Sequence, residues 1–321
     1  MKLLDFLKAL RKKRTVLLLH SLADIDCVAA ALALKRFLGK RAFAVPSDTL
    51  TSPARHLLAS LGLAVDEMPA DYDALIAVDA NAKGMLAESA RSAVFTAVID
   101  HHSRHRNSVR ARRWFCDNAY NATCELLYEA LGKERLDRQT CRLLLAGILA
   151  DSAGFKSASA RTLRYAGELL ERSGLTYSQA LALVDVPADL SQRLALLKAA
   201  QRAKMERLGE KGDALVAIST VGSFEAGAAT ALVELGADFA FVGCEAEGGG
   251  RISARQKSAH EAEVNLAEVM AEVGREFGGS GGGHANAAGA NGIEKGKLEA
   301  ALARCVEIVK KKIGGVRTHS I

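Results

Sequence analysis

Short apolar runs of strand length alternate with stretches of helical periodicity through the first half of this chain. The strand-length runs lie at residues 15–20, 42–45, 74–79 and 93–99, and the helical stretches lie at 27–38, 52–61, 121–131, 138–150 and 160–173. Because a helix between two strands lets them run in the same direction, this alternation predicts a parallel β-sheet covered by helices, an α/β fold. In such a sheet, functional groups gather at the carboxyl ends of the strands.

The alternation pauses after residue 188 and resumes at 214. The intervening residues, 189–211, are rich in helix formers, and we interpret them as a linker helix. Strand-like runs then lie at 214–219, 239–246 and 250–256, and helical stretches at 224–235, 262–276 and 296–312. The prediction is therefore an N-terminal parallel-sheet domain at 1–188, a linker helix at 189–211, and a smaller α/β C-terminal domain at 212–321.

Composition excludes several classes of protein. The chain has 321 residues, 49% of them hydrophobic, and its longest apolar stretches are interrupted by aspartates before they reach the length of a membrane span. Residues 1–14 read as a short amphipathic helix rather than a secretory signal, because the basic cluster follows the apolar residues. The six cysteines form no CxxC pair. We expect a reduced, cytoplasmic protein, and the net charge of +6 suits a phosphate-bearing ligand.

Acidic and imidazole side chains follow one predicted strand after another. They are His20, Asp24, Asp26, Asp79, Asp100, His101, His102 and, at the end of an apolar helix, Asp151. Taken singly, an aspartate after a strand is more often a turn former or a helix N-cap. Gathered at one sheet edge, however, these groups would repel one another strongly unless cations neutralised them.

The mixture of carboxylates and imidazoles indicates which cations would bind. Mn²⁺ accepts both donor types, whereas Mg²⁺ prefers fewer nitrogen ligands and Zn²⁺ usually fewer carboxylates. Six such ligands fit two cations about 3.5–4 Å apart that share one bridging carboxylate. We therefore expect two divalent cations as cofactors, Mn²⁺ first, with Mg²⁺ or Co²⁺ as alternatives.

A glycine-rich segment, GGSGGGHANAAGA at 278–290, lies between the last two predicted helices. An isolated glycine run is ordinarily a flexible connection. Here His284 and the helix-like ANAAGA follow at once, so the segment can instead be a loop whose backbone N–H groups approach an anion. Arg255 is a natural partner, because a guanidinium can hold a terminal phosphate with two hydrogen bonds.

An arginine run follows the acid and imidazole cluster. It comprises Arg104, Arg106, Arg110, Arg112 and Arg113. Charge runs are usually solvated loops, but its place in the sequence favours recruitment of polyanions to the predicted site. The nearby Trp114, Phe115 and Tyr120 could stack on a base or belong to the core.

These motifs together resemble those of the DHH phosphoesterase family. HSLADID at 20–26, the strand-ending Asp79, DHH at 100–102 and GILADSAGF at 147–155 look like its four motifs. SAR at 253–255 and GGSGGGHANAAG at 278–289 look like its associated C-terminal substrate domain. The resemblance covers nearly the whole chain in the expected order, and it implies an active site in the cleft between the two domains.

The resemblance also implies a role for each residue. His20 and Asp24 would bind one metal, Asp26, His101 and Asp151 the other, and Asp79 would bridge them. His102 would face the scissile phosphate, and Asp100 would fix the tautomer of a neighbouring imidazole. The substrate-binding residues would be Ser253, Arg255, Gly281, Gly282, Gly283 and His284. Three departures from the family pattern, Cys27, Ser152 and Ala285, remove no ligand and bear on substrate preference.

The compact two-domain organisation resembles the nano-RNase and pAp-phosphatase branch more than the larger RecJ-like exonucleases. It implies a Mn²⁺-dependent hydrolase that releases 5′-mononucleotides from short oligonucleotides. Alternatives with the same chemistry are pAp hydrolysis, cyclic-dinucleotide cleavage and polyphosphate cleavage. Alternatives from other classes are a catalytically silent nucleotide-binding module and an editing factor for aminoacylated tRNA. The expected partner is a short single strand or a small nucleotide, with no membrane and no obligate protein partner; a homodimer is compatible with the sequence.

Overall fold

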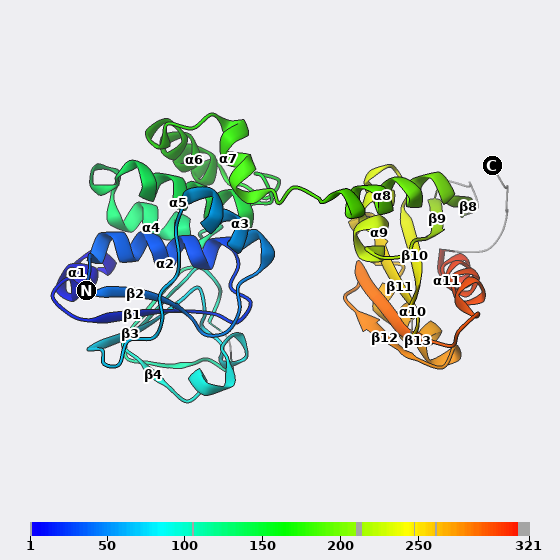
Figure 1. Cartoon of the computed structure of the whole chain (residues 1–321), viewed down its shortest axis with the longest axis horizontal. Helices are drawn as coiled ribbons and strands as arrows, with labels where there is room; N and C mark the ends of the chain where they lie inside the picture. The colour runs from blue at the N-terminus through cyan, green and yellow to red at the C-terminus, as the bar shows by residue number, and fades with distance from the viewer. Residues whose placement is uncertain (1, 105, 210–213, 247, 261, 314–321) are drawn as a thin grey trace. The chain divides into compact units, whose positions relative to one another are not determined.

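The structure is a computed structural model that divides into two compact units, Met1–Val186 and Pro187–Ile321 (Figure 1). It describes every residue except 1, 105, 210–213, 247, 261 and 314–321. Each unit has its own sheet and its own hydrophobic core. The predicted α/β class with two domains is confirmed.

The first unit is built on a parallel sheet with the strand order β2-β1-β3-β5-β7. Its strands are β1 Thr15–Leu19, β2 Ala42–Pro46, β3 Ala74–Val78, β5 Ala97–Asp100 and β7 Trp114–Cys116. Every residue of β1 and of β3 is buried. Both faces of the sheet are therefore covered, which explains why the strands read as continuous apolar runs rather than as alternating ones.

Helices cover one face of this sheet, and an irregular lobe covers the other. The helices are α1 Leu3–Leu10, α2 Ile25–Leu38, α3 Ser52–Leu61, α4 Thr123–Leu131, α5 Arg138–Asp151, α6 Ala160–Ser173 and α7 Tyr177–Val184. The lobe contains β4 Val94–Phe95, which pairs with β6 Arg110–Ala111. The strand predicted at 93–99 is thus divided at Thr96 between this lobe and the main sheet.

The second unit contains a mixed sheet with the order β12-β13-β11-β10-β9-β8. Its strands are β8 Lys204–Leu208, β9 Ala214–Thr220, β10 Phe239–Ala246, β11 Gly249–Gln256, β12 Ser280–Gly283 and β13 Ala287–Ile293. Its helices are α8 Leu190–Arg202, α9 Glu225–Glu234, α10 Leu266–Glu276 and α11 Leu298–Ile313. Apolar residues of α10 and α11 pack on one face of the sheet, and those of α8 and α9 pack on the other.

Two predictions for the second unit are wrong in detail. The linker helix ends at Arg202, and the residues after it form strand β8, which pairs with β9. The glycine-rich segment is not a loop followed by a helix but the hairpin β12–β13. Glycine disfavours strands intrinsically, so sequence alone indicated a loop, whereas pairing and packing decide the conformation here.

The predictions about the cysteines and about membrane spans can also be compared with the structure. The cysteines are all free, as expected for a reduced protein. Among the described residues, no helix combines the length and the apolar character that crossing a membrane would require.

Candidate metal centre

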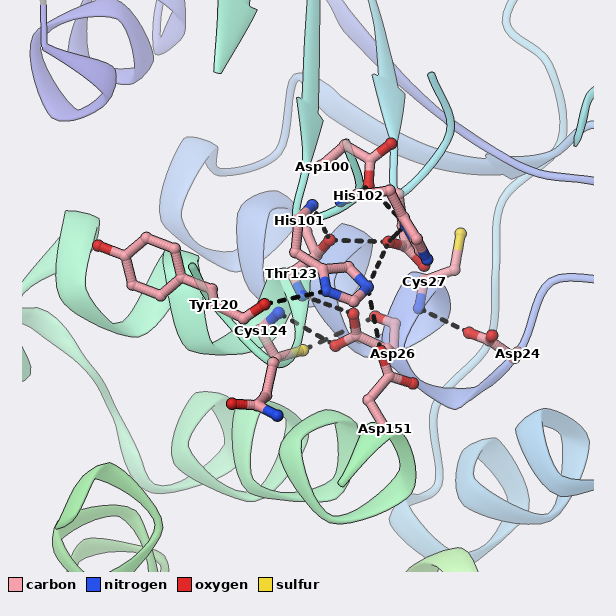
Figure 2. Close-up of polar contacts among 12 residues, drawn as sticks. Asp24, Asp26, Cys27, Asp100, His101, His102, Tyr120, Thr123, Cys124 and Asp151 are labelled. Carbon is pink, nitrogen blue, oxygen red and sulfur yellow. Dashed lines mark hydrogen bonds and ion pairs between the residues drawn. The ribbon is translucent and has the colours of Figure 1, made fainter. Parts of the chain in front are cut away.

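The predicted acids and imidazoles converge at the carboxyl edge of the first sheet (Figure 2). Leu19 pairs with Val78 and Val78 with Ile99, so the next residues of the three strands, His20, Asp79 and Asp100, lie side by side. The helices that follow supply Asp24 and Asp26 from the start of α2, and Asp151 from the end of α5. All eight residues singled out in the first unit are therefore brought to one place.

Asp79 lies in the middle of this centre, with one carboxylate oxygen directed to each side. Its Oδ2 is 3.8 Å from Nε2 of His20, and its Oδ1 is 3.7 Å from Nε2 of His101. The backbone of Asp79 is in the left-handed region with φ of 54°. A non-glycine residue adopts this conformation only where its surroundings impose it, often at functional sites. The geometry is that of a bridging carboxylate.

A second group of donors comprises Asp26, His101 and Asp151. Their ligand atoms all lie within 4.8 Å of one another, and His101 Nε2 is 3.3 Å from Asp151 Oδ2. Asp26 is fully buried, and its carboxylate accepts hydrogen bonds from the backbone N–H groups of Thr123 and Cys124. These are the first N–H groups of α4, whose N-cap residue has no capping side chain. Asp26 thus satisfies the helix N-terminus from a distant part of the chain.

Gly147 permits α5 to approach this group closely. A Cβ atom at this position would lie 2.5 Å from Oδ1 of Asp26 and 2.3 Å from Sγ of Cys124. Both distances are shorter than real Cβ contacts, so only glycine fits without displacing the carboxylate. The glycine within the apolar helix is therefore explained by the position of Asp26, although a glycine in a helix interior costs roughly 0.5–1 kcal/mol relative to alanine.

On the other side of Asp79, His20 lies near Asp24. His20 Nε2 is 3.8 Å from Asp24 Oδ1. Asp24 is also the N-cap of α2 and accepts a hydrogen bond from the N–H of Cys27. Its capping role and a ligand role are compatible, because a carboxylate has about four lone-pair sites. The ordinary explanation for a single aspartate, an N-cap, holds for Asp24 and does not exclude a ligand role.

The imidazoles are oriented so that one nitrogen of each is available to a cation. Nδ1 of His20 lies 2.8 Å from the carbonyl oxygen of Ser21, and Nδ1 of His101 lies 3.3 Å from that of Tyr120. Both carbonyls favour an Nδ1–H tautomer, which leaves Nε2 as a lone-pair donor. Nε2 of His101 is buried without a hydrogen-bond partner. A buried nitrogen that faces carboxylate oxygens of Asp151 and Asp79 without a hydrogen bond to either suits a metal ligand, so the residues present fit a divalent cation.

The electrostatics of the centre lead to the same conclusion. Burial, with the charges of neighbouring carboxylates, raises the pKa of Asp26 to about 7 and that of Asp79 to about 7. Burial alone would lower the pKa of His101, but its contact with Asp151 and the charge of Asp79 outweigh this effect and raise it to about 9. The pKa of His20 is raised to about 9 for similar reasons, against burial and through Asp24. Without cations, the centre retains protons to reduce its negative charge.

His102 and Asp100 form a pair at the rim of the centre. Asp100 is fully buried, and its Oδ1 accepts hydrogen bonds from the backbone N–H of His102 and, at 2.8 Å, from its Nδ1. The side chain of His102 is half exposed. This contact presents Nε2 of His102 to solvent, where a substrate could meet it. The geometry fits the implied roles of Asp100 as the positioning residue and His102 as the contact to substrate.

Two further residues belong to the centre: Thr123, which no motif indicated, and Cys27, which the sequence marked only as a departure from the family pattern. Thr123 donates its hydroxyl to Asp79 and accepts the N–H of His101 at its Oγ1, so it ties the central carboxylate to the His101 side. The thiol of Cys27 is buried, donates to the carbonyl of Val78, and lies with His20 and Asp79 in a third potential ligand group. A threonine at the start of a helix has no pattern of its own, so only the tertiary structure identifies it.

The arginine run does not lie beside the centre as a single patch. Strand β7 runs parallel to β5, with Trp114 opposite Val98. Arg113 therefore lies level with the start of β5. At ~3.3 Å per residue, this is about 10 Å along the strand from Asp100. Arg104 remains nearer, and its guanidinium lies 4.1 Å from the ring centroid of Trp114. The indole face that could have stacked on a base is therefore occupied by an arginine.

In the second unit, the predicted substrate-binding residues lie in two neighbouring rows across the sheet. Ser253 pairs with Gly289, which pairs with Gly282. Arg255 pairs with Ala287, whose carbonyl accepts the backbone N–H of His284. Residues opposite one another in a sheet share a face. Ser253, Arg255 and His284 therefore surround a floor of two glycines.

The glycines of this hairpin differ in what would prevent a side chain at each position. A Cβ on Gly281 would lie 2.0 Å from the carbonyl oxygen of Met270, because α10 packs directly on β12. Gly283 has φ of 141°, a conformation that side chains rarely adopt. A Cβ on Gly282, by contrast, would meet nothing within 4 Å. Packing explains Gly281 and backbone conformation explains Gly283, and only Gly282 lines open space.

Comparison with known families identifies both units. Residues 14–148 match the model of the DHH family, N-terminal domain, and residues 225–311 match that of the DHHA1 domain. An uncharacterised protein of Methanocaldococcus jannaschii is 29% identical over 303 residues, which cover 91% of this chain and 90% of that protein.

Solved structures share the fold. An exopolyphosphatase-related protein from Bacteroides fragilis matches with a TM-score of 0.68 at 17% identity, over 96% of this chain and 95% of that one. A pGpG-specific phosphodiesterase from Vibrio cholerae matches with a TM-score of 0.51 at 13% identity, over 94% of this chain and 100% of that one. At such identities the similarity is one of fold.

Proposed function

This chain belongs to the DHH family of phosphoesterases, and from that premise we propose that it is a Mn²⁺-dependent hydrolase that degrades short single-stranded oligonucleotides to 5′-mononucleotides. The observation that carries the proposal is the position of Asp79, whose two oxygens are directed to His20 and to His101. One shared carboxylate between two sets of donors is the arrangement of a two-metal phosphoester hydrolase.

In this proposal, the six predicted ligands would hold two cations. His20 and Asp24 would hold one, Asp26, His101 and Asp151 would hold the other, and Asp79 would contribute to both. When bound, the cations supply Lewis acidity, which activates water for attack on phosphorus and offsets charge on the phosphoryl oxygens. The centre lies at a sheet edge where His102 and Asp24 are about half exposed, so a phosphate can reach it.

The protein's own groups orient the reaction. Asp100 holds Nδ1 of His102 by a hydrogen bond of 2.8 Å, so Nε2 of the imidazole is presented to the substrate. In protonated form, Nε2 can donate to a phosphoryl oxygen or to the leaving oxygen. The carboxylate of Asp100, fully buried beside His102, raises the pKa of that imidazole and so favours the protonated form.

The second unit would bind the part of the substrate that is not hydrolysed. Ser253, Arg255 and His284 lie near Gly282, beside which the space is open, and their side chains can donate to a phosphate. A phosphate held there would favour substrates of fixed short length. The free cysteines fit a reducing, cytoplasmic setting for such an enzyme.

The structural neighbours suggest two substrate classes. The phosphodiesterase named for pGpG fits an oligonucleotide of two residues, whereas the exopolyphosphatase-related protein fits the polyphosphate alternative. We favour the oligonucleotide because it carries a further phosphate that the donors of the glycine-floored site could bind. Hydrolysis of pAp and of cyclic dinucleotides remains within the same chemistry.

A substrate panel tests the proposal. Purified protein with Mn²⁺ is incubated with RNA and DNA of two to ten residues, pAp, cyclic dinucleotides and polyphosphate, and products are separated by chromatography. We expect 5′-mononucleotides from the shortest strands. The Asp79→Ala variant should lose at least about 1,000-fold of the rate, because even outer residues of a metal site are worth 10–100-fold.

Asp71→Ala is the matched control. Asp71 is an exposed acid of the same unit that pairs with Arg14 at the surface, and its removal should leave the rate unchanged. Full activity of Asp79→Ala would refute the shared-carboxylate role, and hydrolysis of polyphosphate alone would refute the oligonucleotide assignment.

A further inference from the structure

A cavity of about 690 Å³ lies next to the metal centre within the first unit. Two of the predicted ligands, Asp24 and Asp151, form one side of it (both are labelled in Figure 2). The other sides come from the start of α3, the turn after α5, and α7. A volume of several hundred cubic ångströms is typical of small-molecule sites, and the cavity opens directly beside the ligands.

The walls of the cavity are mostly apolar. They include Ile25, Pro53, Leu149, Leu181 and Val184. A bare polyphosphate would lose hydration against these side chains without gaining hydrogen bonds. A flat aromatic group would instead gain from burial, at roughly 25 cal/mol per Å² of apolar surface removed from water.

One wall carries an aromatic ring in a fixed position. Tyr177, the first residue of α7, is 41% exposed and lines the cavity. Its ring stacks on that of Phe155, with centroids 5.7 Å apart and planes inclined by 14°. Phe155 packs on the core, so Tyr177 is supported from behind while its other face remains available.

The turn that carries Phe155 has an unusual backbone. Ala153, Gly154 and Phe155 all have positive φ, at 48°, 65° and 75°. The turn is held by Ser152, whose Oγ accepts the N–H of Phe155 and donates to the carbonyl of Ile148. Left-handed residues in succession cost free energy and persist where the surroundings require them. Here the result is an aromatic pair placed close to Asp151.

The cavity is lined by more negative than positive side chains. Asp24 and Asp151 lie on the side of the metal centre, and Asp185 lies at the end of α7. Lys156 is the basic residue of the lining. Once cations occupy the centre, a phosphate is attracted there, but a second phosphate within the cavity would meet Asp185. The charges therefore favour one phosphate at the metals and an uncharged group beyond it.

We propose that this cavity binds the nucleobase of the nucleotide whose phosphate lies at the metal centre, with Tyr177 as the stacking surface. The inference rests on the proposed function and extends it, because it assigns the substrate to nucleotides and not to polyphosphate. Tyr177 is then a specificity residue, and Phe155 and Ser152 are positioning residues.

The test compares two ligands that differ only in the base. AMP and ribose 5-phosphate are titrated calorimetrically into the full chain with Mn²⁺. Wild type should bind AMP roughly tenfold more tightly, as expected for stacking of one base on an aromatic ring. Tyr177→Ala should abolish that difference while leaving the affinity for ribose 5-phosphate unchanged, and Tyr177→Phe should keep it, because the ring and not the hydroxyl stacks.

Tyr72→Ala is the matched control, since Tyr72 is a similarly exposed tyrosine of the same unit that lines a different cavity. It should bind both ligands as wild type does. The proposal would be overturned if wild type bound AMP and ribose 5-phosphate with equal affinity. It would also be overturned if Tyr177→Ala weakened the binding of both ligands equally.

The same samples separate this inference from the proposed function. If a dinucleotide is hydrolysed but AMP binds no more tightly than ribose 5-phosphate, the base-binding proposal is rejected and the proposed hydrolase activity is retained. If nothing is hydrolysed but AMP still binds more tightly in a Tyr177-dependent way, the hydrolase proposal is rejected and the base-binding site is retained.

Discussion

The two candidate sites of this molecule are built in opposite ways. The metal centre of the first unit draws its groups from segments between His20 and Asp151, and most of those groups are buried. The glycine-floored site of the second unit comes from one strand and one hairpin, and its side chains are half exposed or exposed. One site depends on the convergence of distant charges, and the other on the absence of side chains from a local surface.

The difference shows what each kind of chemistry demands of a fold. Burying several carboxylates together is unfavourable unless cations or protons neutralise them, so the first site must be held by the whole core around it. A surface that receives a phosphate needs donors and space, which a short hairpin can supply locally. We therefore expect changes near the metal centre to affect chemistry and stability together, and changes to the exposed groups of the second site to affect binding alone.

Gly147→Ala should produce the largest effect. The new methyl group would displace the Asp26 carboxylate from a distance of 2.5 Å, so we expect roughly a 100-fold loss of Mn²⁺-dependent rate, comparable with loss of a supporting residue in a metal site. Overpacking should also destabilise the protein by about 1–3 kcal/mol. Enzyme kinetics and thermal unfolding, with and without Mn²⁺, measure both effects.

Gly167→Ala is the control for that experiment. Gly167 lies within α6, and a Cβ there would meet nothing within 4 Å. The same substitution should raise stability by about 0.5–1 kcal/mol through helix propensity and leave the rate unchanged. If both variants behave alike, close packing around Asp26 is not what makes Gly147 necessary.

Arg255→Ala should separate binding from chemistry. Loss of a bidentate phosphate contact should raise KM for a short oligonucleotide by roughly 10- to 100-fold, since hydrogen bonds to charged groups contribute about 1.5–3 kcal/mol. Hydrolysis of a small chromogenic phosphodiester, which has no second phosphate for Arg255 to bind, should be unchanged. Steady-state kinetics with both substrates decide the matter, and equal losses on the two would reject a length-measuring role.

Gly281 and Gly282 offer a smaller and sharper comparison. Alanine at 281 would lie 2.0 Å from the carbonyl of Met270, whereas alanine at 282 would point into open space. We expect Gly281→Ala to lower stability by about 1–3 kcal/mol. Gly282→Ala should leave stability within about 0.5 kcal/mol and weaken oligonucleotide binding. Chemical denaturation and titration of the two variants test this, and equal destabilisation would contradict it.

The stability of the metal-free protein should depend on pH through the carboxylates and imidazoles of the centre. Burial and neighbouring acids raise the pKa of Asp26 and Asp79 to about 7, and neighbouring acids raise that of His20 and His101 to about 9 against the effect of burial. All four groups then bind more protons when folded than when unfolded, so stability falls as the pH rises from roughly 4 to 9. Thermal unfolding should show a lower Tm at pH 8.5 than at pH 6.

Mn²⁺ should reverse this trend, because it replaces the protons that the carboxylates lose. The gain in Tm on adding Mn²⁺ should therefore be larger at pH 8.5 than at pH 6. Asp79→Asn, which cannot ionise, should flatten the metal-free dependence and reduce the gain. A metal-free Tm that rises with pH would show that the carboxylates are not crowded as the structure has them.

The sequence alone determined the class of fold and pointed to the residues that the structure gathers in the candidate metal centre. Buried strands read as apolar runs, and the groups that follow them, such as His20 and Asp79, stand out because acids and imidazoles are unusual beside a core. A parallel sheet brings such groups to one edge by geometry, so their convergence could be inferred without coordinates. The order of the motifs supported the same assignment.

Only the tertiary structure decided the contacts between segments distant in sequence. It showed that Thr123 ties Asp79 to His101, that a glycine is needed at 147 beside Asp26, and that part of the glycine run is a strand packed on α10. It also showed that the arginines do not form one patch beside the centre, and that a cavity lies next to Tyr177. Periodicity and propensity are local properties of a chain, whereas close packing depends on which distant surfaces meet, and that is settled only when the whole core forms.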